Sequence, residues 1–291
     1  MAAPILVTGG TGTLGRLVVS RLRGAGRDVR VLSRHHRDGT DGVEFVAGDL
    51  DSGEGIDAAV AGVEVVVHCA GASKGDEHKA RRLVQAAEQA GVRHLVNVSV
   101  VGADRVPVAS GVDRAMFAYF ASKLAAERVV AGAGVPWTTL RATQFHQLMA
   151  TVARALAKLP VVPLPAGFRF QPVDAADVAA RLADLALGTP AGLAPDVAGP
   201  KVYAAAELVR GYLRATGRRR PILPVWLPGG AARALRAGAN LAPDHAVGHR
   251  TWEDFLAAAL SAPPPERPSA GVGWDAGGAG QLQRDVARSR T

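Results

Sequence analysis

The chain has little cysteine and few aromatic side chains: one Cys, at position 69, and 5% Phe, Trp and Tyr together. A single cysteine excludes a disulfide within the chain and is typical of a reducing compartment. Because aromatics are few, the core has to be built from Ala, Val and Leu, and a hydrophobic content of 48% is enough for a large one. Packing of this kind is typical of parallel sheets covered by helices on both faces.

Other absences narrow the class of protein. No apolar run reaches the ~18 residues that a membrane-spanning helix needs, and the opening MAAPILV lacks the basic start of a signal peptide. We therefore expect a cytoplasmic protein without a membrane partner. The net charge is +8, but there is no nucleic-acid motif and no long basic run, so no nucleic-acid partner is expected. The eight histidines show no ligand spacing with cysteine or acids, so no metal site is expected.

Short apolar runs alternate with helical periodicities along the first half of the chain. The runs predict strands at residues 5–8, 29–33, 43–47, 63–68, 95–99 and 137–141. The periodicities predict helices after residue 13 and at 55–61, 76–90 and 115–131, with an irregular segment at 102–114. This alternation predicts an α/β fold with a Rossmann-type doubly wound parallel sheet.

The strongest motif is the segment TGGTGTLG at residues 8–15, which satisfies G-x-G-x-x-G. It follows a predicted strand and opens a predicted helix, the context in which glycines let a backbone approach a pyrophosphate at a helix N-terminus. The motif predicts a bound dinucleotide. The residues expected to contact it here are Gly9, Gly12, Thr13, Leu14 and Gly15.

The end of the second strand indicates which dinucleotide is bound. Proteins that bind NAD place an acid there to hold the ribose 2′-hydroxyl. This chain has Ser33 and Arg34 instead, and no carboxylate before Asp38. Because Arg34 suits a 2′-phosphate, NADP(H) is the predicted cofactor, with NAD(H) possible. The alternative is that Arg34 and Arg37 are solvated loop charges.

After the sixth predicted strand the pattern loosens into helices joined by Pro-rich turns. We expect a dinucleotide-binding core at residues 1–143 and a small C-terminal substrate lobe at 144–260, packed on the same sheet and adding one or two late strands to it. The segment 261–291 is rich in Pro, Gly, Ala and Arg and is expected to be a flexible tail.

Further motifs resemble the short-chain dehydrogenase/reductase superfamily, in its extended or atypical branch and closest to the NmrA-like NAD(P)H-binding group. Besides residues 8–15, the resemblance rests on GDL at 48–50, HCAG at 68–71, AAEQAGVRHLVNVSVVGA at 86–103, YFASK at 119–123 and TTLRATQF at 138–145. It covers residues 4–260 and is specific for fold and cofactor rather than for substrate.

The resemblance implies further contacts to the cofactor. The implied positions are Asp49 and Leu50 at the adenine, Ala70 and Gly71 along the ribose, and Thr143, Gln144 and Phe145 beside the nicotinamide. Without the resemblance these residues have ordinary structural explanations, such as a turn cap for an Asp and core packing for a Phe.

Tyr119 and Lys123 lie four residues apart on a predicted helix, so they share a face and match the family's Y-x-x-x-K pair. A phenol with a pKa near ~10 needs a nearby cation to exchange protons at neutral pH, and Lys123 supplies one and can hold the nicotinamide ribose. Ser99 is the expected third catalytic residue. Strand alternation leaves open whether it faces the substrate, and Ser110 or a backbone group is the alternative.

We therefore expect an NADP(H)-dependent oxidoreductase that transfers hydride to or from a small carbonyl, quinone or enone, as a monomer or homodimer. One alternative is a non-catalytic NADP(H)-binding redox sensor, and another is an NAD-dependent nucleotide-sugar epimerase or dehydratase, which Arg34 disfavours. His146, after the sixth strand, is either a further acid–base group or a polar residue that begins a helix.

Overall fold

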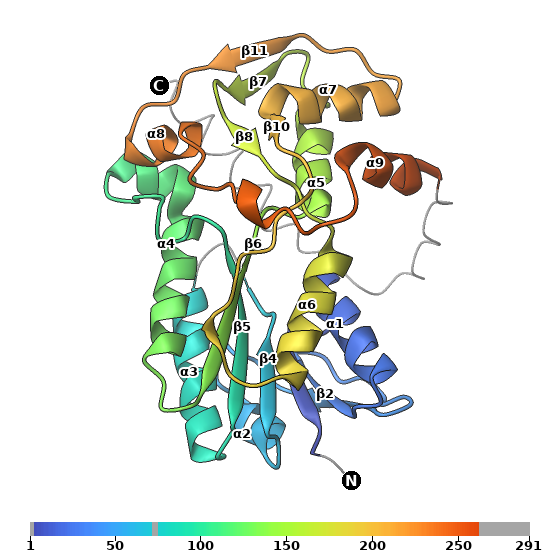
Figure 1. Ribbon diagram of the computed structural model, residues 1–291, viewed down its shortest axis with the longest axis vertical. Helices are drawn as coiled ribbons and strands as arrows, with labels where there is room; N and C mark the ends of the chain where they lie inside the picture. The colour runs from blue at the N-terminus through green and yellow to red at the C-terminus, as the bar shows by residue number, and fades with distance from the viewer. Residues whose placement is uncertain (1–2, 72–74, 262–291) are drawn as a thin grey trace.

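A computed structural model describes residues 3–71 and 75–261, and at its centre lies a seven-stranded parallel sheet (Figure 1). The strand order is β3-β2-β1-β4-β5-β6-β9, so the chain winds outward in both directions from β1. This confirms the predicted doubly wound fold. The strands of this sheet are β1 (Ile5–Thr8), β2 (Val29–Ser33), β3 (Val43–Ala47), β4 (Val65–His68), β5 (His94–Val100), β6 (Trp137–Ala142) and β9 (Gly192–Leu193).

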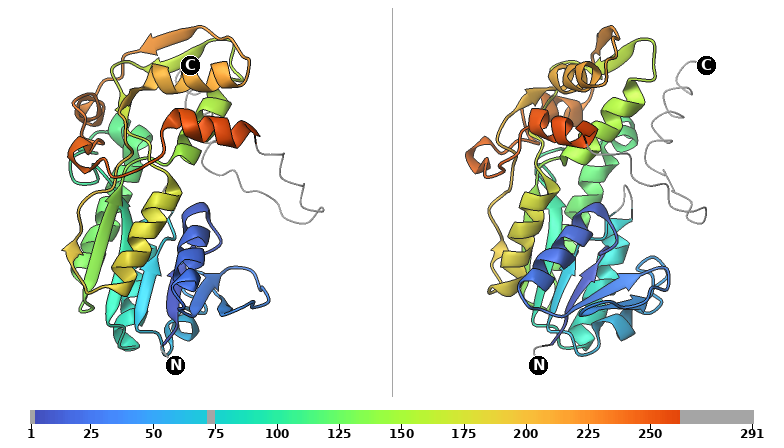
Figure 2. Two further views of the ribbon diagram at one scale, coloured as in Figure 1. Left: turned by 45° about the vertical axis from the view of Figure 1, so that its right-hand side comes forward. Right: turned by 90° about the vertical axis from the view of Figure 1, so that its right-hand side faces the viewer.

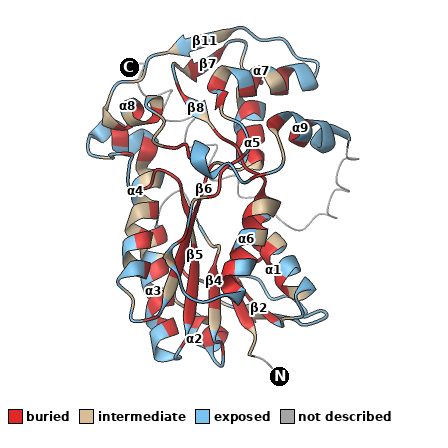
Figure 3. Cartoon of the chain, in the orientation of Figure 1, coloured by how far each residue is buried: buried red, intermediate tan, exposed pale blue. Residues whose placement is uncertain are grey.

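Helices cover both faces of the sheet, and the strands between them are largely buried (Figure 3). One face carries α1 (Thr13–Gly24) and α6 (Ala175–Leu187), and the other carries α2 (Ile56–Val60), α3 (Asp76–Gln89) and α4 (Gly111–Ala131). Successive strand residues point to opposite faces. On β5, Val96 accordingly packs with α1 and α6, whereas Leu95 packs with α3 and α4.

The remaining elements form a second layered unit beyond the carboxyl ends of the strands (Figures 1 and 2). Trp252 is 1% exposed in its core, and the indole N–H donates to the carbonyl of Leu208 at 3.1 Å. Its elements are α5 (His146–Leu156), α7 (Ala205–Ala215), α8 (Gly230–Arg236), α9 (Trp252–Ser261), a 3-10 turn (Pro243–His245), the parallel strands β7 (Val162–Pro165) and β11 (Ile222–Val225), and the antiparallel strands β8 (Arg169–Phe170) and β10 (Tyr203–Ala204).

The predicted lobe at 144–260 does not lie wholly in this second unit, because α6 and β9 return to the central sheet. The strand β9 is a late addition of the kind expected. The domain boundary between residues 143 and 144 stays a prediction, and the predicted tail lies outside the described residues beyond Ser261. Among residues 3–71 and 75–261, no helix has the length and apolar character that a bilayer crossing requires.

Helix α4 begins four residues earlier than predicted, so the irregular segment expected at 102–114 was wrong over its last turn. The side chain of Ser110 accepts a hydrogen bond from the Asp113 N–H at 3.0 Å, and the Asp113 carboxylate accepts one from the Ser110 N–H at 3.3 Å. This reciprocal capping box fixes the helix start. The helix then bends at Phe117, where φ is −129° and ψ is 16°.

A buried ion network fastens α4 to the sheet. The guanidinium of Arg141 on β6 donates to both carboxylate oxygens of Glu127 on α4, at 2.9 and 2.7 Å, and lies 2.9 Å from the carboxylate of Asp104. Arg141 and Glu127 are each 8% exposed. The hydrogen bonds that Arg141 donates to the carboxylates of Glu127 and Asp104 hold the pKa of Arg141 above its ordinary value. The network joins helix, strand and the loop after β5 at one point.

Replacing Arg141 with Met should lower the free energy of unfolding by about 3 kcal/mol, because Glu127 would stay buried without its main counter-charge. Urea denaturation of the purified protein measures the change. The matched control is Arg81→Met, which removes an exposed ion pair with Glu77 and should cost much less. Equal losses in the two variants would show that the Arg141 network adds no more than a surface pair does.

Candidate functional site

The glycine turn between β1 and α1 is shaped by backbone contacts. Gly9 has φ of +69°, and a Cβ atom on it would lie 2.7 Å from the backbone nitrogen of Ala70. A Cβ atom on Gly15 would overlap the carbonyl oxygen of Gly9. Neither position accepts a larger residue without movement of the backbone. The turn therefore packs tightly against the start of its helix and against the loop that follows β4.

The N-terminus of α1 is open to an anion. Gly12 is the residue before the helix, and no side chain of the described residues caps it. The first turn contains no acid. Free N–H groups and the helix dipole at such an end favour a phosphate. Thr13 is exposed, whereas the Leu14 side chain is buried in the core, which leaves Leu14 only its backbone to offer a ligand.

At the end of β2, the Ser33 hydroxyl donates to the carbonyl of His35 at 2.8 Å and is buried. Arg34 follows it and is exposed, with no ion-pair partner among the described residues. The Arg34 guanidinium is therefore available to an anionic group at this end of the sheet. The nearest acid along the chain, Asp38, pairs with His36 at 3.7 Å.

Asp49 and Leu50 follow β3 and have clear structural roles. The Asp49 carboxylate accepts a hydrogen bond from the Asp51 N–H at 2.9 Å, which is an Asx turn. Leu50 is 5% exposed and packs in the core under α2. Their predicted contact with an adenine stays a prediction.

The last residue of β4 and the segment after it carry two ionisable side chains, those of His68 and Cys69. Burial and the charge of Lys123 lower the pKa of His68 to about 4, so its ring is neutral, and its Nδ1 lies 2.7 Å from the hydroxyl of Thr8 at the end of β1. Burial raises the pKa of the Cys69 thiol to about 12, so the sulfur stays protonated. Ala70 is half-buried and Gly71 exposed. This segment joins the ends of β1 and β4.

Tyr119 and Lys123 share one face of α4, as predicted. The Lys123 Nζ lies 5.8 Å from the centroid of the Tyr119 ring. Tyr119 is 40% exposed and open to a ligand, whereas Lys123 is 8% exposed. Burial raises the pKa of Tyr119, the Lys123 ammonium partly offsets this rise, and the carboxylate of Asp76 adds to it. The phenol therefore keeps its proton at neutral pH.

Lys123 is paired with an acid that our sequence reasoning did not single out. Its Nζ lies 2.8 Å from Oδ2 of Asp76, the first residue of α3. Burial alone would lower the pKa of Lys123, but Tyr119 and Asp76 outweigh it and raise that pKa. An acid in the first turn of a helix is ordinary, so Asp76 gave no signal in the sequence. The signal that was available is that a buried lysine requires a partner.

Ser99 lies on the face of β5 that α3 and α4 cover, because it is in phase with Leu95. Its orientation, which strand alternation alone left open, is thus towards the helix that carries Tyr119 and Lys123. The side chain is 6% exposed, and its Oγ has no hydrogen-bond partner among the described residues. Ser110, the alternative hydroxyl, is used as the cap of α4.

The segment between β6 and α5 adds buried polar groups at the same edge of the sheet. The Thr143 hydroxyl donates to the carbonyl of Gln171 at 2.6 Å, and Phe145 is half-buried in the core beside α1 and α6. The side-chain oxygens of Gln144 and Gln147 are buried without a hydrogen-bond partner in the described part of the chain. These two amide oxygens are acceptors that a ligand could use.

His146 begins α5 and is fully buried. Its ring stacks with Trp252 and Phe255, at centroid distances of 6.0 and 5.1 Å. Burial lowers the pKa of His146 to about 4, so the ring is neutral at physiological pH. Of the two interpretations of His146, the packing favours a residue that begins a helix over an acid–base group.

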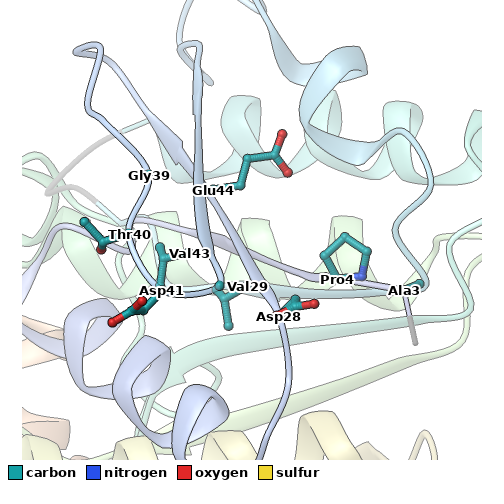
Figure 4. A pocket seen from close by; sticks show the side chains of 10 residues that line it. Ala3, Pro4, Asp28, Val29, Gly39, Thr40, Asp41, Val43 and Glu44 are labelled. Atoms are coloured by element: carbon teal, nitrogen blue, oxygen red, sulfur yellow. The ribbon is translucent and has the colours of Figure 1, made fainter. Parts of the chain in front are cut away.

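An open hollow of about 630 Å³ lies elsewhere on the protein (Figure 4). It is formed at the amino-terminal ends of β2 and β3, opposite the edge that carries the glycine turn. Its lining includes the acids Asp28, Asp41 and Glu44 and none of the site residues predicted above. Carboxylates repel phosphates, so this hollow does not suit a dinucleotide.

Comparison with known proteins agrees with this geometry. A family model described as NAD(P)H-binding matches residues 9–187. The chain is 33% identical over 219 residues to a (4-alkanoyl-5-oxo-2,5-dihydrofuran-3-yl)methyl phosphate reductase of Streptomyces griseus, with 74% of each chain covered. It is 30% identical over 222 residues to an NAD(P)H azoreductase of Xenophilus azovorans, again with 74% of each covered.

Among solved structures, an NADPH-dependent quinone oxidoreductase of Escherichia coli in complex with NADPH superposes with a TM-score of 0.73. The sequences are 19% identical, and the alignment covers 88% of this chain and 99% of the other. At this identity the likeness concerns the fold, and it agrees with the parallel sheet and glycine turn described above. The chain belongs to the NAD(P)H-binding family, and its motifs resemble the NmrA-like group of the short-chain dehydrogenase/reductase superfamily.

Proposed function

We propose that the protein is an NADP(H)-dependent oxidoreductase that transfers hydride to or from a small carbonyl, quinone or enone. The observation that carries this proposal is that the loop after β4 contacts both the glycine turn and Lys123. Ala70 touches the glycine turn at Gly9, and the next residue, Gly71, lies against the Lys123 ammonium. The dinucleotide turn and the tyrosine–lysine pair are thus assembled around one segment.

The residues present fit a dinucleotide. A Cβ atom on Gly9 or Gly15 would fill the turn, and the uncapped end of α1 offers N–H groups to a pyrophosphate. We assign the pyrophosphate to Gly9, Gly12, Thr13, Leu14 and Gly15, the 2′-phosphate to Ser33 and Arg34, the adenine to Asp49 and Leu50, the ribose to Ala70, Gly71 and Lys123, and the nicotinamide to Thr143 and Phe145. When bound, the nicotinamide supplies or accepts the hydride.

The side chains would manage the accompanying proton. Tyr119 is exposed to a ligand and protonated at neutral pH, so its hydroxyl can donate to a carbonyl oxygen that gains negative charge. Lys123 remains cationic and stabilises the phenolate that is left. The Ser99 hydroxyl, which has no partner in the described residues and lies on the same side of the sheet, would donate a second hydrogen bond to that oxygen.

The relatives support the reaction class. The two curated proteins above are named as reductases, and the structural neighbour is a quinone oxidoreductase. Their substrates differ from one another, so they support hydride transfer rather than one substrate. Preference for NADP(H) over NAD(H) rests on Arg34 alone.

Arg34→Ala should weaken NADPH binding about tenfold or more and leave NADH binding nearly unchanged, because only NADPH has a 2′-phosphate for the guanidinium. Titration by calorimetry or nicotinamide fluorescence measures both affinities. Arg93→Ala is the matched control, since it removes an exposed arginine before β5, at the opposite edge of the sheet. Equal affinity of the wild-type protein for both cofactors would remove the basis for the 2′-phosphate assignment.

Gly15→Ala should reduce NADPH affinity by tenfold or more, because the added methyl group would displace the backbone of Gly9. Gly24→Ala on the same helix has no atom within 4 Å of its new Cβ and should bind as the wild type does. The same titration measures both variants. Unchanged binding by a folded Gly15→Ala protein would place the dinucleotide elsewhere.

Tyr119→Phe should lower kcat by about 10²- to 10⁴-fold and leave the affinity for NADPH within about threefold, because the lost hydroxyl acts on the proton rather than on the cofactor. NADPH oxidation is followed with a quinone, an enone and an aromatic aldehyde. Cofactor binding without turnover of any of the three by the wild-type protein would favour the redox sensor instead. Turnover that is equal in wild type and variant would remove Tyr119 from the mechanism.

A further inference from the structure

We propose that Asp76 is a positioning residue, which holds the Lys123 ammonium on the loop after β4 and limits how strongly its charge acts on Tyr119. This proposal rests on the proposed function only in taking Tyr119 as the proton donor. Asp76 acts in two ways: it holds Lys123 in place, and its negative charge opposes that of Lys123 at Tyr119.

The pair is buried and its geometry is close. The distance from Lys123 Nζ to Asp76 Oδ2 is 2.8 Å, and the side chains are 10% and 1% exposed. An ion pair in such surroundings is costly to break from one side, because the remaining charge would be left without water or partner. An exposed pair such as Arg81 with Glu77 imposes no comparable constraint.

The pair also lies directly against the backbone of the loop after β4, at Gly71. A Cβ atom added to Gly71 would be 2.8 Å from Lys123 Nζ and 3.5 Å from Asp76 Oδ2. Any other residue at position 71 would push the ammonium away. The absence of a side chain at Gly71 and the carboxylate of Asp76 together define where the ammonium stands.

A second contact fixes the two helices at this point. The backbone N–H of Asp76 faces the hydroxyl oxygen of Ser122 at 3.4 Å. Ser122 precedes Lys123 on α4, and Asp76 is the first residue of α3. The start of α3 is thereby joined to the same turn of α4 through side chain and backbone. A displacement of Asp76 would move the lysine rather than leave it in place.

The charge states of the neighbouring groups decide how the Lys123–Asp76 pair acts on Tyr119. Among residues 3–71 and 75–261, the ionisable groups that face it are Tyr119 on α4, His68 at the end of β4, Cys69 just after it, and Lys79 on α3. His68 is neutral and Cys69 protonated near pH 7, because burial lowers the pKa of the first to about 4 and raises that of the second to about 12. Lys79 is engaged by Asp51 at 3.2 Å.

Lys123 and Asp76 therefore act on Tyr119 with opposite sign. The ammonium lowers the pKa of Tyr119 and the carboxylate raises it. Without the carboxylate charge, the ammonium would be unopposed, and the phenol would lose its proton at a lower pH. Because the proposed reduction needs the protonated phenol, activity would then decline earlier on the alkaline side.

The test is a titration of Tyr119 by NMR with ¹³C-labelled tyrosine. The chain has three tyrosines, so Tyr119→Phe assigns the signal without ambiguity. In Asp76→Asn, Tyr119 should titrate at a lower pH than in the wild type, and the alkaline limb of kcat/KM should move in the same direction. The matched control is Glu77→Gln, which removes the neighbouring acid of α3 from its exposed pair and should leave both curves unchanged.

Because Asp76→Asn could fail to fold, Asp76→Ser provides a second neutral variant with a smaller polar side chain. It should shift the Tyr119 titration the same way. An unshifted titration in a folded neutral variant, or an equal shift in Glu77→Gln, would overturn the proposal. The NMR titration needs no substrate, so it tests the role of Asp76 even if the protein reduces none of the compounds tried. A lack of reduction would count against the proposed function alone.

Discussion

The contact between the loop after β4 and its two neighbours is the constraint on which the site depends. On one side a backbone atom of Ala70 leaves no room for a side chain at Gly9, and on the other the ammonium of Lys123 leaves none at Gly71. Close approach therefore favours glycine at both positions, and the positive φ of Gly9 favours it there as well. The glycine turn and the Tyr119–Lys123 pair, which are more than 100 residues apart in the chain, meet through the consecutive residues Ala70 and Gly71.

Two sets of contacts hold α4, and with it Tyr119 and Lys123, in place. Its start is fixed by Ser110 and Asp113, and its C-terminal part is fastened to β6 by Glu127, one turn beyond Lys123. A helix held at both points cannot rotate freely about its axis, so the face that carries Tyr119 stays towards the carboxyl edge of the sheet. Preorganisation of this kind keeps a proton donor in position before a ligand arrives. The Arg141–Glu127 network thus also holds in place the helix that carries Tyr119 and Lys123.

Much of the fold followed from local pattern. The runs at 5–8, 29–33 and 43–47 are strands with the predicted bounds, and the helix expected at 76–90 is α3. Periodicity was sufficient for β1, β2 and α3 because each buries an apolar stripe, whereas β3, at the edge of the sheet, is a short apolar run that is only partly buried. Periodicity failed at residues 111–114, where a capping box rather than hydrophobic residues starts the helix. The partner of Lys123 could not be predicted, since pairing between α3 and α4 depends on the tertiary arrangement and Asp76 looks like any first-turn acid.

The state of Cys69 bears on how the protein withstands reactive compounds. A sulfur attacks electrophiles as the thiolate, and burial keeps this one as the thiol. Conjugated carbonyl compounds and quinones alkylate proteins chiefly at thiolates, and the chain has no second cysteine to offer them. Because the single thiol of the chain stays protonated in the loop after β4, Cys69 should resist alkylation by such compounds.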